Sequence, residues 1–113
     1  MPKKGAVILV PFPFTDLSEN KVRPAVVLSC AMKGEDVVVA FISSQKPRKL
    51  QLLDIAIARS NEMFSQTGLK MDSIIKIGKI ATLDKKIILG ELGHIHKDTE
   101  REIDKKIKIL FGL

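Results

Sequence analysis

The two residues best suited to joint chemistry are Arg23 and Ser43. Arg23 precedes Pro24 and an apolar run, and Ser43 follows a second apolar run. If residues 24–42 form an antiparallel hairpin, the start of its first strand lies beside the end of its second, so Arg23 and Ser43 are neighbours. A guanidinium beside a hydroxyl suits a phosphate group, because the guanidinium is a planar fork of hydrogen-bond donors. The spacing is equally consistent with a solvated arginine beside a polar strand end.

Basic and polar side chains surround this pair in the sequence. Ser44 and Gln45 follow Ser43 directly. We expect a positively charged rim around one groove, formed by Lys21, Arg23, Lys46, Arg48, Lys49 and Lys76. The whole chain has 19 Lys and Arg against 13 Asp and Glu, which gives a formal net charge of +6. This excess favours a polyanionic partner only modestly, because many solvated proteins carry one.

The other candidate residues for chemistry are His94, His96 and Cys30. The two histidines are spaced i, i+2, which on a strand places both on one side, where they can act as acid and base. They immediately precede a predicted helix, where polar residues are ordinary, so we favour a structural role. Cys30 is interpreted as a buried thiol. One cysteine and two histidines exclude a cysteine-based zinc site and leave little for another transition-metal site, so we expect neither metal nor cofactor.

The elements that must position these residues are mostly short strands. Turn residues separate runs that are rich in β-branched side chains, and the glycines inside some runs mark bulges or bends. The expected strands are 6–10, 24–30, 37–42, 52–58, 73–83 (interrupted around Gly78) and 87–95. A polar loop covers 15–22, and a short helical turn over 60–67 ends at Gly68.

The end of the chain has the periodicity of a helix. Thr99 and Glu102 fit a capping box, in which each side chain satisfies a backbone N–H of the first turn. Apolar residues then follow at i, i+4, i+7 and i+8, namely Ile103, Ile107, Leu110 and Phe111. The fold class predicted is therefore mainly β with a C-terminal α-helix, a small and strongly bent antiparallel sheet or half-barrel that the helix closes.

Length and hydropathy restrict the class of protein. A chain of 113 residues with 45% hydrophobic content predicts one domain, residues 1–113, with a core that needs no covalent staples. No apolar run approaches the roughly 20 residues that cross a bilayer. We therefore expect a soluble, cytoplasmic protein with no membrane partner.

Four segments of the chain, in this order and spacing, resemble the MazF/PemK-like toxins of bacterial toxin–antitoxin pairs. They are Gly5–Asp16 with its Pro-Phe-Pro-Phe-Thr-Asp run, Lys21–Ser29 with Arg-Pro, Val39–Gln45, and Thr82–Asp84. The resemblance implies a homodimeric, SH3-like antiparallel β-barrel of the MazF/PemK type. It also implies an endoribonuclease that cleaves single-stranded RNA, often mRNA, without metal and inhibits growth. In such an enzyme the 2′-hydroxyl attacks the adjacent phosphate and leaves a 2′,3′-cyclic phosphate and a 5′-hydroxyl.

The resemblance also implies roles for particular residues. Arg23 and Ser43 match the family's catalytic arginine and hydroxyl. The implied RNA-binding residues are Thr15, Asp16, Glu19, Lys21, Ser44, Gln45, Lys46, Arg48 and Lys76. A cognate antitoxin with an acidic C-terminal segment would occupy the same groove. The chain departs from the family pattern at Ala6 and Gly78, where members carry acidic residues, and Ser43 stands where threonine is frequent.

Two alternatives to a ribonuclease stay open from the sequence. One is a non-catalytic toxin or binding module of the same fold, which blocks a protein target such as gyrase or binds RNA without cleaving it. The other is a DNA-binding regulator, which is less favoured because no recognition helix is predicted.

Overall fold

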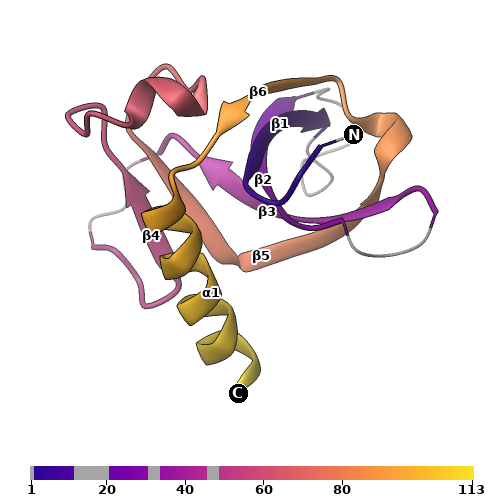
Figure 1. Ribbon diagram of the computed structural model, residues 1–113. Helices are drawn as coiled ribbons and strands as arrows, with labels where there is room; N and C mark the ends of the chain where they lie inside the picture. Colours follow the sequence, from indigo (N-terminus) through magenta and orange to yellow (C-terminus); the bar gives the residue numbers. More distant parts are fainter. Residues whose placement is uncertain (1, 12–20, 31–33, 46–48) are drawn as a thin grey trace.

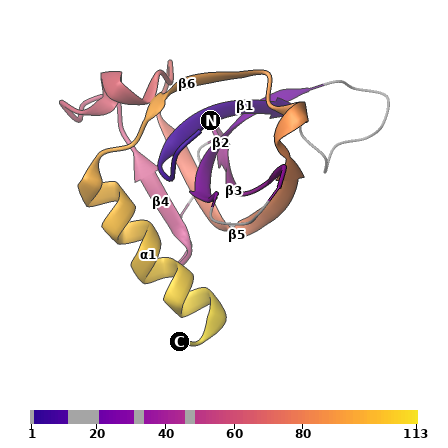
Figure 2. The ribbon, with the colours of Figure 1, turned by 45° about the vertical axis from the view of Figure 1, so that its right-hand side comes forward.

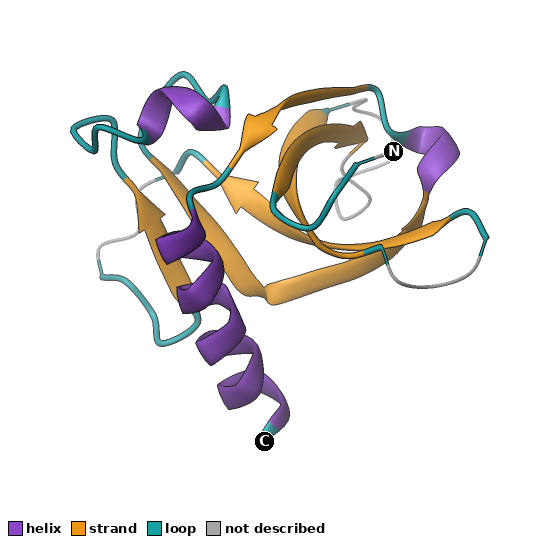
Figure 3. Ribbon diagram, in the orientation of Figure 1, coloured by secondary structure: helices purple, strands orange, loops and turns teal. Residues whose placement is uncertain are grey.

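The computed structural model describes residues 2–11, 21–30, 34–45 and 49–113, and six strands in them form one antiparallel sheet (Figures 1 and 3). The order of the strands across the sheet is β4-β5-β3-β2-β1-β6. The strands are β1 (Ala6–Pro11), β2 (Val22–Ser29), β3 (Asp36–Ser43), β4 (Asp54–Ile57), β5 (Ser73–Asp84) and β6 (Gly90–His94). A C-terminal helix, α1 (Lys97–Phe111), lies against the sheet. The predicted fold class, mainly β with a C-terminal helix, is confirmed.

The hairpin predicted over 24–42 is present, but both of its strands are longer than expected. Strand β2 begins at Val22, because Val22 and Arg23 pair with the end of β1. Strand β3 continues to Ser43, which pairs with Ile74 of β5. Arg23 and Ser43 therefore lie inside paired strands, and their backbones are held more firmly than those of loop residues.

Two predicted strands are shorter in the structure. Strand β4 covers only 54–57 of the predicted 52–58. Of the predicted strand 87–95, only 90–94 pairs as a strand, and the chain first makes a 3₁₀ turn, η2 (Lys85–Ile87). The Asp84 carboxylate accepts the N–H of Lys86 at 2.9 Å and caps that turn. A side chain that captures a nearby backbone N–H competes in this way with strand pairing.

The sheet curls because three of its strand pairs are irregular. The register shifts by one residue between β1 and β6 and between β2 and β3, and by three residues between β3 and β5. Such shifts bend a strand and increase its twist. In Figure 2 the strands β1, β2, β3 and β5 surround the inside of the curl, and α1 lies outside it. The break in β5 falls at residues 77–79, so the predicted interruption around Gly78 is confirmed.

Two clusters of buried side chains occupy the two faces of the sheet. The inner cluster fills the curl and includes Val10, Phe41 and Leu83. The outer cluster lies between the sheet and α1, and it includes Ile75 of the sheet and Ile103 of the helix. Residues that pair directly across strands point to the same face. The face of any residue in the sheet therefore follows from its cross-strand partners.

Helix α1 begins three residues earlier than the predicted capping box implies. The N-cap is His96, whose backbone is extended (φ −71°, ψ 155°) and whose Nδ1 accepts the N–H of Asp98 at 3.2 Å. The capping role predicted for Thr99 is therefore wrong, because Thr99 already lies in the first turn. Phe111 is also not a core residue. It is 63% exposed, because the last turn of α1 extends past the sheet (Figure 1). In the described part of the chain, no helix has the length and apolar character needed to cross a membrane.

Candidate functional site

Arg23 and Ser43 lie on the inner face of the sheet, at the same end of the hairpin of β2 and β3. Arg23 pairs with Val10 of β1, a member of the inner cluster. Ser43 stands two residues after Phe41, another member of that cluster, so its side chain points to the same face. The last pair between β2 and β3 joins Ala25 to Phe41. The same register, continued by two residues, predicts that Arg23 and Ser43 stand opposite each other.

The hydroxyl of Ser43 is held in place by the chain that follows it. Its Oγ accepts the backbone N–H of Gln45 at 3.2 Å. A hydroxyl has one donor proton in addition to its acceptor lone pairs, so Oγ can still donate to a bound oxygen atom. Serine lacks the methyl group that restricts the rotamer of threonine. The hydrogen bond from Gln45 supplies a different restraint at this position.

Lys76 faces the same side of the sheet and forms an ion pair with Asp54. Phe41 pairs with Lys76, which places Lys76 two pairs along β3 from Ser43 and on the same face. The Lys76 Nζ lies 3.2 Å from Oδ1 and 3.3 Å from Oδ2 of Asp54. The side chain of Asp54 is 5% exposed and that of Lys76 is 26% exposed. Lys76 is thus a partly buried cation next to the pair Arg23 and Ser43.

Asp54 is the member of this neighbourhood that we did not identify from the sequence. Its Oδ2 also accepts the N–H of Gln51 at 2.9 Å, so the carboxylate has two partners. The relevant feature in the sequence is an acidic residue that breaks the apolar alternation of a short strand. Buried acids are almost always paired, and β4 places Asp54 directly opposite Lys76.

The remaining predicted RNA-binding residues divide into two groups. Lys21, Ser44 and Gln45 are exposed at the same ends of β2 and β3 that carry Arg23 and Ser43, and Lys49 of the expected rim is exposed too. The others lie outside the described residues, namely Thr15, Asp16, Glu19, Lys46 and Arg48.

A pocket of about 240 Å³ lies beside Ile74, the cross-strand partner of Ser43, and we call it the β3–β4 pocket because residues of the connection between β3 and β4 line it. Ser43 pairs with Ile74, and Ile74 pairs with Ala56, so the row of residues that begins at Arg23 continues into the pocket. Its lining residues are Gln45, Leu50, Ala56, Ile57, Ala58, Asp72, Ser73 and Ile74. Ile74 therefore links the pocket to Ser43 across the sheet.

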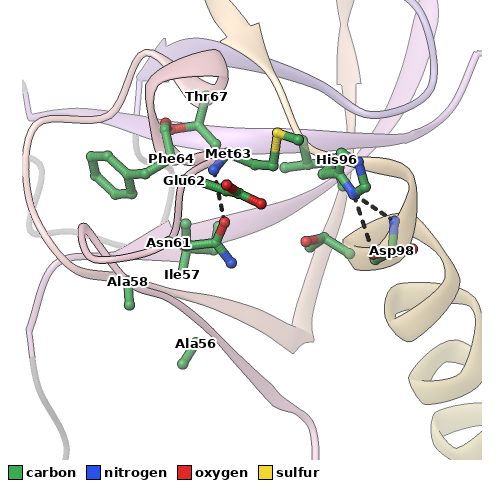
Figure 4. A pocket seen from close by; sticks show the side chains of 12 residues that line it. Ala56, Ile57, Ala58, Asn61, Glu62, Met63, Phe64, Thr67, His96 and Asp98 are labelled. Atoms are coloured by element: carbon green, nitrogen blue, oxygen red, sulfur yellow. Dashed lines mark hydrogen bonds and ion pairs between the residues drawn. The ribbon is translucent and has the colours of Figure 1, made fainter.

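The two histidines do not form a joint site. His96 lines a pocket of about 210 Å³ where β4, the segment 61–67 and the start of α1 meet (Figure 4). His94 lines a different pocket together with Lys3 and Lys97. The strand ends at His94, so the i, i+2 spacing no longer places both imidazoles on one side. The acid–base interpretation of this pair is therefore wrong.

At the pocket of His96, the side chains of Asn61 and His96 accept hydrogen bonds from nearby backbone N–H groups. Figure 4 shows His96 and Asp98 on the helix side and Asn61 and Glu62 on the other. The Asn61 Oδ1 accepts the N–H of Met63 at 2.8 Å, and His96 caps α1. In the described ranges, no three His, Cys, Asp or Glu side chains gather closely enough to hold a metal ion. The surface around Arg23 and Ser43 is therefore the best candidate site.

Comparison with known proteins identifies the family of the chain and supports its fold. Residues 3–111 match the family model described as PemK-like, MazF-like toxin of type II toxin–antitoxin system. No curated protein matches the chain significantly in sequence. The chain is similar in structure to a mycobacterial endoribonuclease in complex with its cognate antitoxin. The TM-score is 0.76 at 19% identity, over 100% of this chain and 97% of that one.

Two further solved structures support the fold. One is the Mycobacterium tuberculosis toxin MazF-mt6, with a TM-score of 0.73 at 16% identity, over 96% of this chain and 97% of that one. The other is MazF from Deinococcus radiodurans, with a TM-score of 0.74 at 19% identity, over 99% and 97% of the two chains. At such identities the likeness establishes the fold and leaves the chemistry to the residues.

Proposed function

Because the chain belongs to the PemK-like, MazF-like toxin family of type II toxin–antitoxin systems, we propose that it is a metal-independent endoribonuclease that cleaves single-stranded RNA, including mRNA, at short sequences. The observation that carries the proposal is the adjacency of Arg23 and Ser43 on one face of the sheet. Structural relatives described as endoribonucleases support the same activity.

The proposed reaction is an internal transfer of the phosphoryl group. The 2′-oxygen forms a bond to phosphorus while the bond from phosphorus to the 5′-oxygen breaks. The proton of the 2′-hydroxyl leaves to solvent, and the departing 5′-oxygen takes up a proton. The products are a 2′,3′-cyclic phosphate and a 5′-hydroxyl, and no metal ion or external oxidant is needed for the balance.

Arg23 and Ser43 act on the charge that develops at the phosphate. Negative charge builds on the non-bridging oxygens in the transition state, and preorganised donors stabilise it. The guanidinium of Arg23 supplies two parallel N–H groups, and Oγ of Ser43 supplies one further donor. Arg23 acts as a charge stabiliser rather than as a base, because guanidinium groups stay protonated in proteins.

The proposal includes the partners and setting of the toxin. A cognate antitoxin places an acidic segment in the groove beside Arg23, and the charge complementarity of the basic rim supports this assignment. The active species is a homodimer in the cytoplasm. Light scattering at micromolar concentration should give about twice the 12.5 kDa of one chain, and a mass near 12.5 kDa would contradict the dimer.

The activity is tested with purified protein and a long single-stranded RNA in the presence of EDTA. The wild type should give discrete fragments with cyclic phosphate ends. Arg23→Ala and Ser43→Ala should each slow cleavage roughly 100-fold to 1,000-fold, the usual cost of losing one such donor. Ser43→Thr should stay active because it keeps the hydroxyl.

Arg101→Ala is the matched control for Arg23→Ala, because Arg101 lies on α1 with its side chain 74% exposed. It should cleave like the wild type. Fragments that persist undiminished in Arg23→Ala would show a contaminating nuclease and refute the assignment. Intact RNA together with growth arrest on expression would instead favour the non-catalytic toxin.

A further inference from the structure

We infer that Asp54 is a positioning residue, which holds the ammonium of Lys76 where it binds the phosphate of the RNA next to the one that is cleaved. This inference rests on the proposed function, since it takes Arg23 and Ser43 as the site of the scissile phosphate. The observation behind it is the ion pair of Asp54 and Lys76, which lies on the same face of the sheet as that site.

The ion pair stands in a row of residues that is otherwise apolar. The cross-strand partners along this row are Ala25, Phe41, Lys76 and Asp54, and Ala25 and Phe41 are 0% and 2% exposed. Replacing a buried ion pair by apolar side chains of similar volume is often neutral or stabilising. Stability alone therefore does not account for two charges in this row, and the adjacent phosphate site offers a reason for them.

Lys76 is placed to contact a second phosphate. It pairs with Phe41, and Ser43 follows two residues later on β3, so Lys76 and Ser43 are diagonal neighbours on one face. Diagonal neighbours lie about 7–8 Å apart, which is comparable to the length that one nucleotide adds to an extended strand. The Lys76 side chain is 26% exposed. A strand whose phosphate lies at Ser43 therefore brings its neighbouring phosphate within reach of the ammonium.

Asp54 restricts the positions that this ammonium can take. The Lys76 Nζ lies 3.2 Å from Oδ1 and 3.3 Å from Oδ2 of Asp54. The carboxylate is 5% exposed, and its Oδ2 also accepts the backbone N–H of Gln51 at 2.9 Å. A lysine that is not held gives up rotamer freedom when it binds a phosphate. The ammonium of Lys76 is already held, so it is preorganised for binding.

The ion pair can contact a phosphate even though its two charges balance. An ammonium has three N–H donors, and the Asp54 carboxylate lies on the β4 side of Lys76. Ser43 lies on the β3 side, so a donor directed to that side reaches the RNA. Because Asp54 offsets the charge of Lys76, the ammonium attracts distant phosphates only weakly. Its main effect is to align the strand at the point of cleavage.

The first experiment compares the cleavage kinetics of Asp54→Asn, Lys76→Met and the double variant. Asp54→Asn keeps the cation but no longer holds it, so kcat should fall roughly tenfold while KM does not rise, because misplacement slows the reaction without removing a contact. Lys76→Met removes the contact, so KM should rise roughly tenfold. In the Lys76→Met background, Asp54→Asn should cause no further loss, because Asp54 acts through Lys76.

All variants are compared at a temperature at which circular dichroism shows each of them to be folded. If Asp54→Asn does not fold, Asp54→Glu takes its place. Glutamate keeps the charge but moves the ammonium by about one methylene, so kcat should again fall while KM does not rise. The same loss of kcat in the wild-type and Lys76→Met backgrounds would show that Asp54 does not act through Lys76, and the inference would be overturned.

The ion pair of Lys4 and Asp104 supplies matched controls. Its N–O distance is 3.0 Å and both side chains are about half exposed, and Asp104 lies on α1, outside the curl of the sheet. Lys4→Met and Asp104→Asn change the net charge as Lys76→Met and Asp54→Asn do. Both should cleave like the wild type. Equal effects at the two pairs would mean that only the net charge matters, which would also overturn the inference.

The second experiment does not depend on cleavage. A strand of 2′-deoxynucleotides cannot react, and a methylphosphonate replaces one of its phosphates by a neutral group, at each position in turn. At one position the neutral group should weaken binding to the wild type roughly tenfold, and the same group should not weaken binding to Lys76→Met. If every position affects the wild type and Lys76→Met equally, Lys76 binds no particular phosphate and the inference is refuted.

The two experiments separate the two proposals. If the wild type cleaves no RNA but one phosphate position depends on Lys76, the ribonuclease proposal fails while the positioning of a phosphate by the ion pair stands. If the wild type cleaves RNA but no position depends on Lys76, the inference about Asp54 and Lys76 alone is refuted.

Discussion

Asp54→Asn should lower the free energy of unfolding by about 3 kcal/mol. Breaking a buried ion pair by removing one partner costs about 3–5 kcal/mol, because the other charge stays buried without compensation. The lower end applies here, because the Lys76 side chain is 26% exposed and its ammonium can partly reach water. Part of the loss comes from Gln51, whose N–H donates to the same carboxylate.

The measurement is thermal unfolding followed by circular dichroism. The chain contains no Trp and no Tyr, so intrinsic tryptophan fluorescence is not an option. A loss of this size should lower Tm by roughly 10 °C or more for a domain of about a hundred residues. Asp104→Asn is the matched control. Asp104 pairs with Lys4 at 3.0 Å, but both side chains are about half exposed, so the loss should stay below about 1 kcal/mol.

A second variant tests the reasoning in the other direction. Lys76→Met leaves the carboxylate of Asp54 at 5% exposure without its cation, so it should cost at least as much as Asp54→Asn. The double variant has no buried charge, and its loss should be smaller than the sum of the single losses by about 1 kcal/mol or more. Strictly additive losses, or an Asp104→Asn loss as large as that of Asp54→Asn, would refute the argument from burial.

Two further predictions concern the backbone. Gly34 and Gly68 both have positive φ, but a Cβ at Gly68 would overlap the carbonyl of Leu92, whereas one at Gly34 would meet no atom of the described residues within 4 Å. Gly34→Ala should lower the free energy of unfolding by about 1–2 kcal/mol. Gly68→Ala should lower it by about 1–3 kcal/mol more, because of the overlap with Leu92. Equal changes in Tm for the two variants would contradict the close contact at Gly68. His96→Ala should lower the free energy of unfolding by about 1 kcal/mol, because it removes the N-cap, and Thr99→Ala should lower it by less. Urea unfolding measures both. The reverse order would favour the capping box at Thr99.

Most of the fold was predictable because the chain alternates between strand-forming runs and turn residues. The hairpin of β2 and β3 follows from two β-branched runs separated by a polar turn. The errors occur where a side chain competes with the backbone pattern. Asp84 caps a turn that extends to the first residue of the predicted strand 87–95, and His96 caps α1 in place of Thr99. Such local hydrogen bonds leave little trace in the hydrophobic periodicity.

The candidate site was predictable only in part. Arg23 and Ser43 come from one hairpin, so their place at the same end of it depends on local pairing alone. The contact between Asp54 and Lys76 joins residues on β4 and β5, and it requires the register of strands that are distant in the sequence. The β3–β4 pocket likewise combines three segments of the chain. The spacing of residues within one segment of the sequence cannot predict contacts between segments that are far apart in the chain.

The break in β5 explains why Lys76 lies on the same face of the sheet as Arg23 and Ser43. Beyond the break, odd-numbered residues such as Leu83 point to the inner cluster, while before it odd-numbered residues such as Ile75 point to the outer cluster. The shift of three residues against β3 is an odd number, so it exchanges the two faces. Without it, Ile75 would face the curl and Lys76 would point toward α1, away from Ser43. The glycine at position 78 lies in this break, and the interruption of the apolar pattern of β5 is therefore what brings Lys76 to the face that carries Arg23 and Ser43.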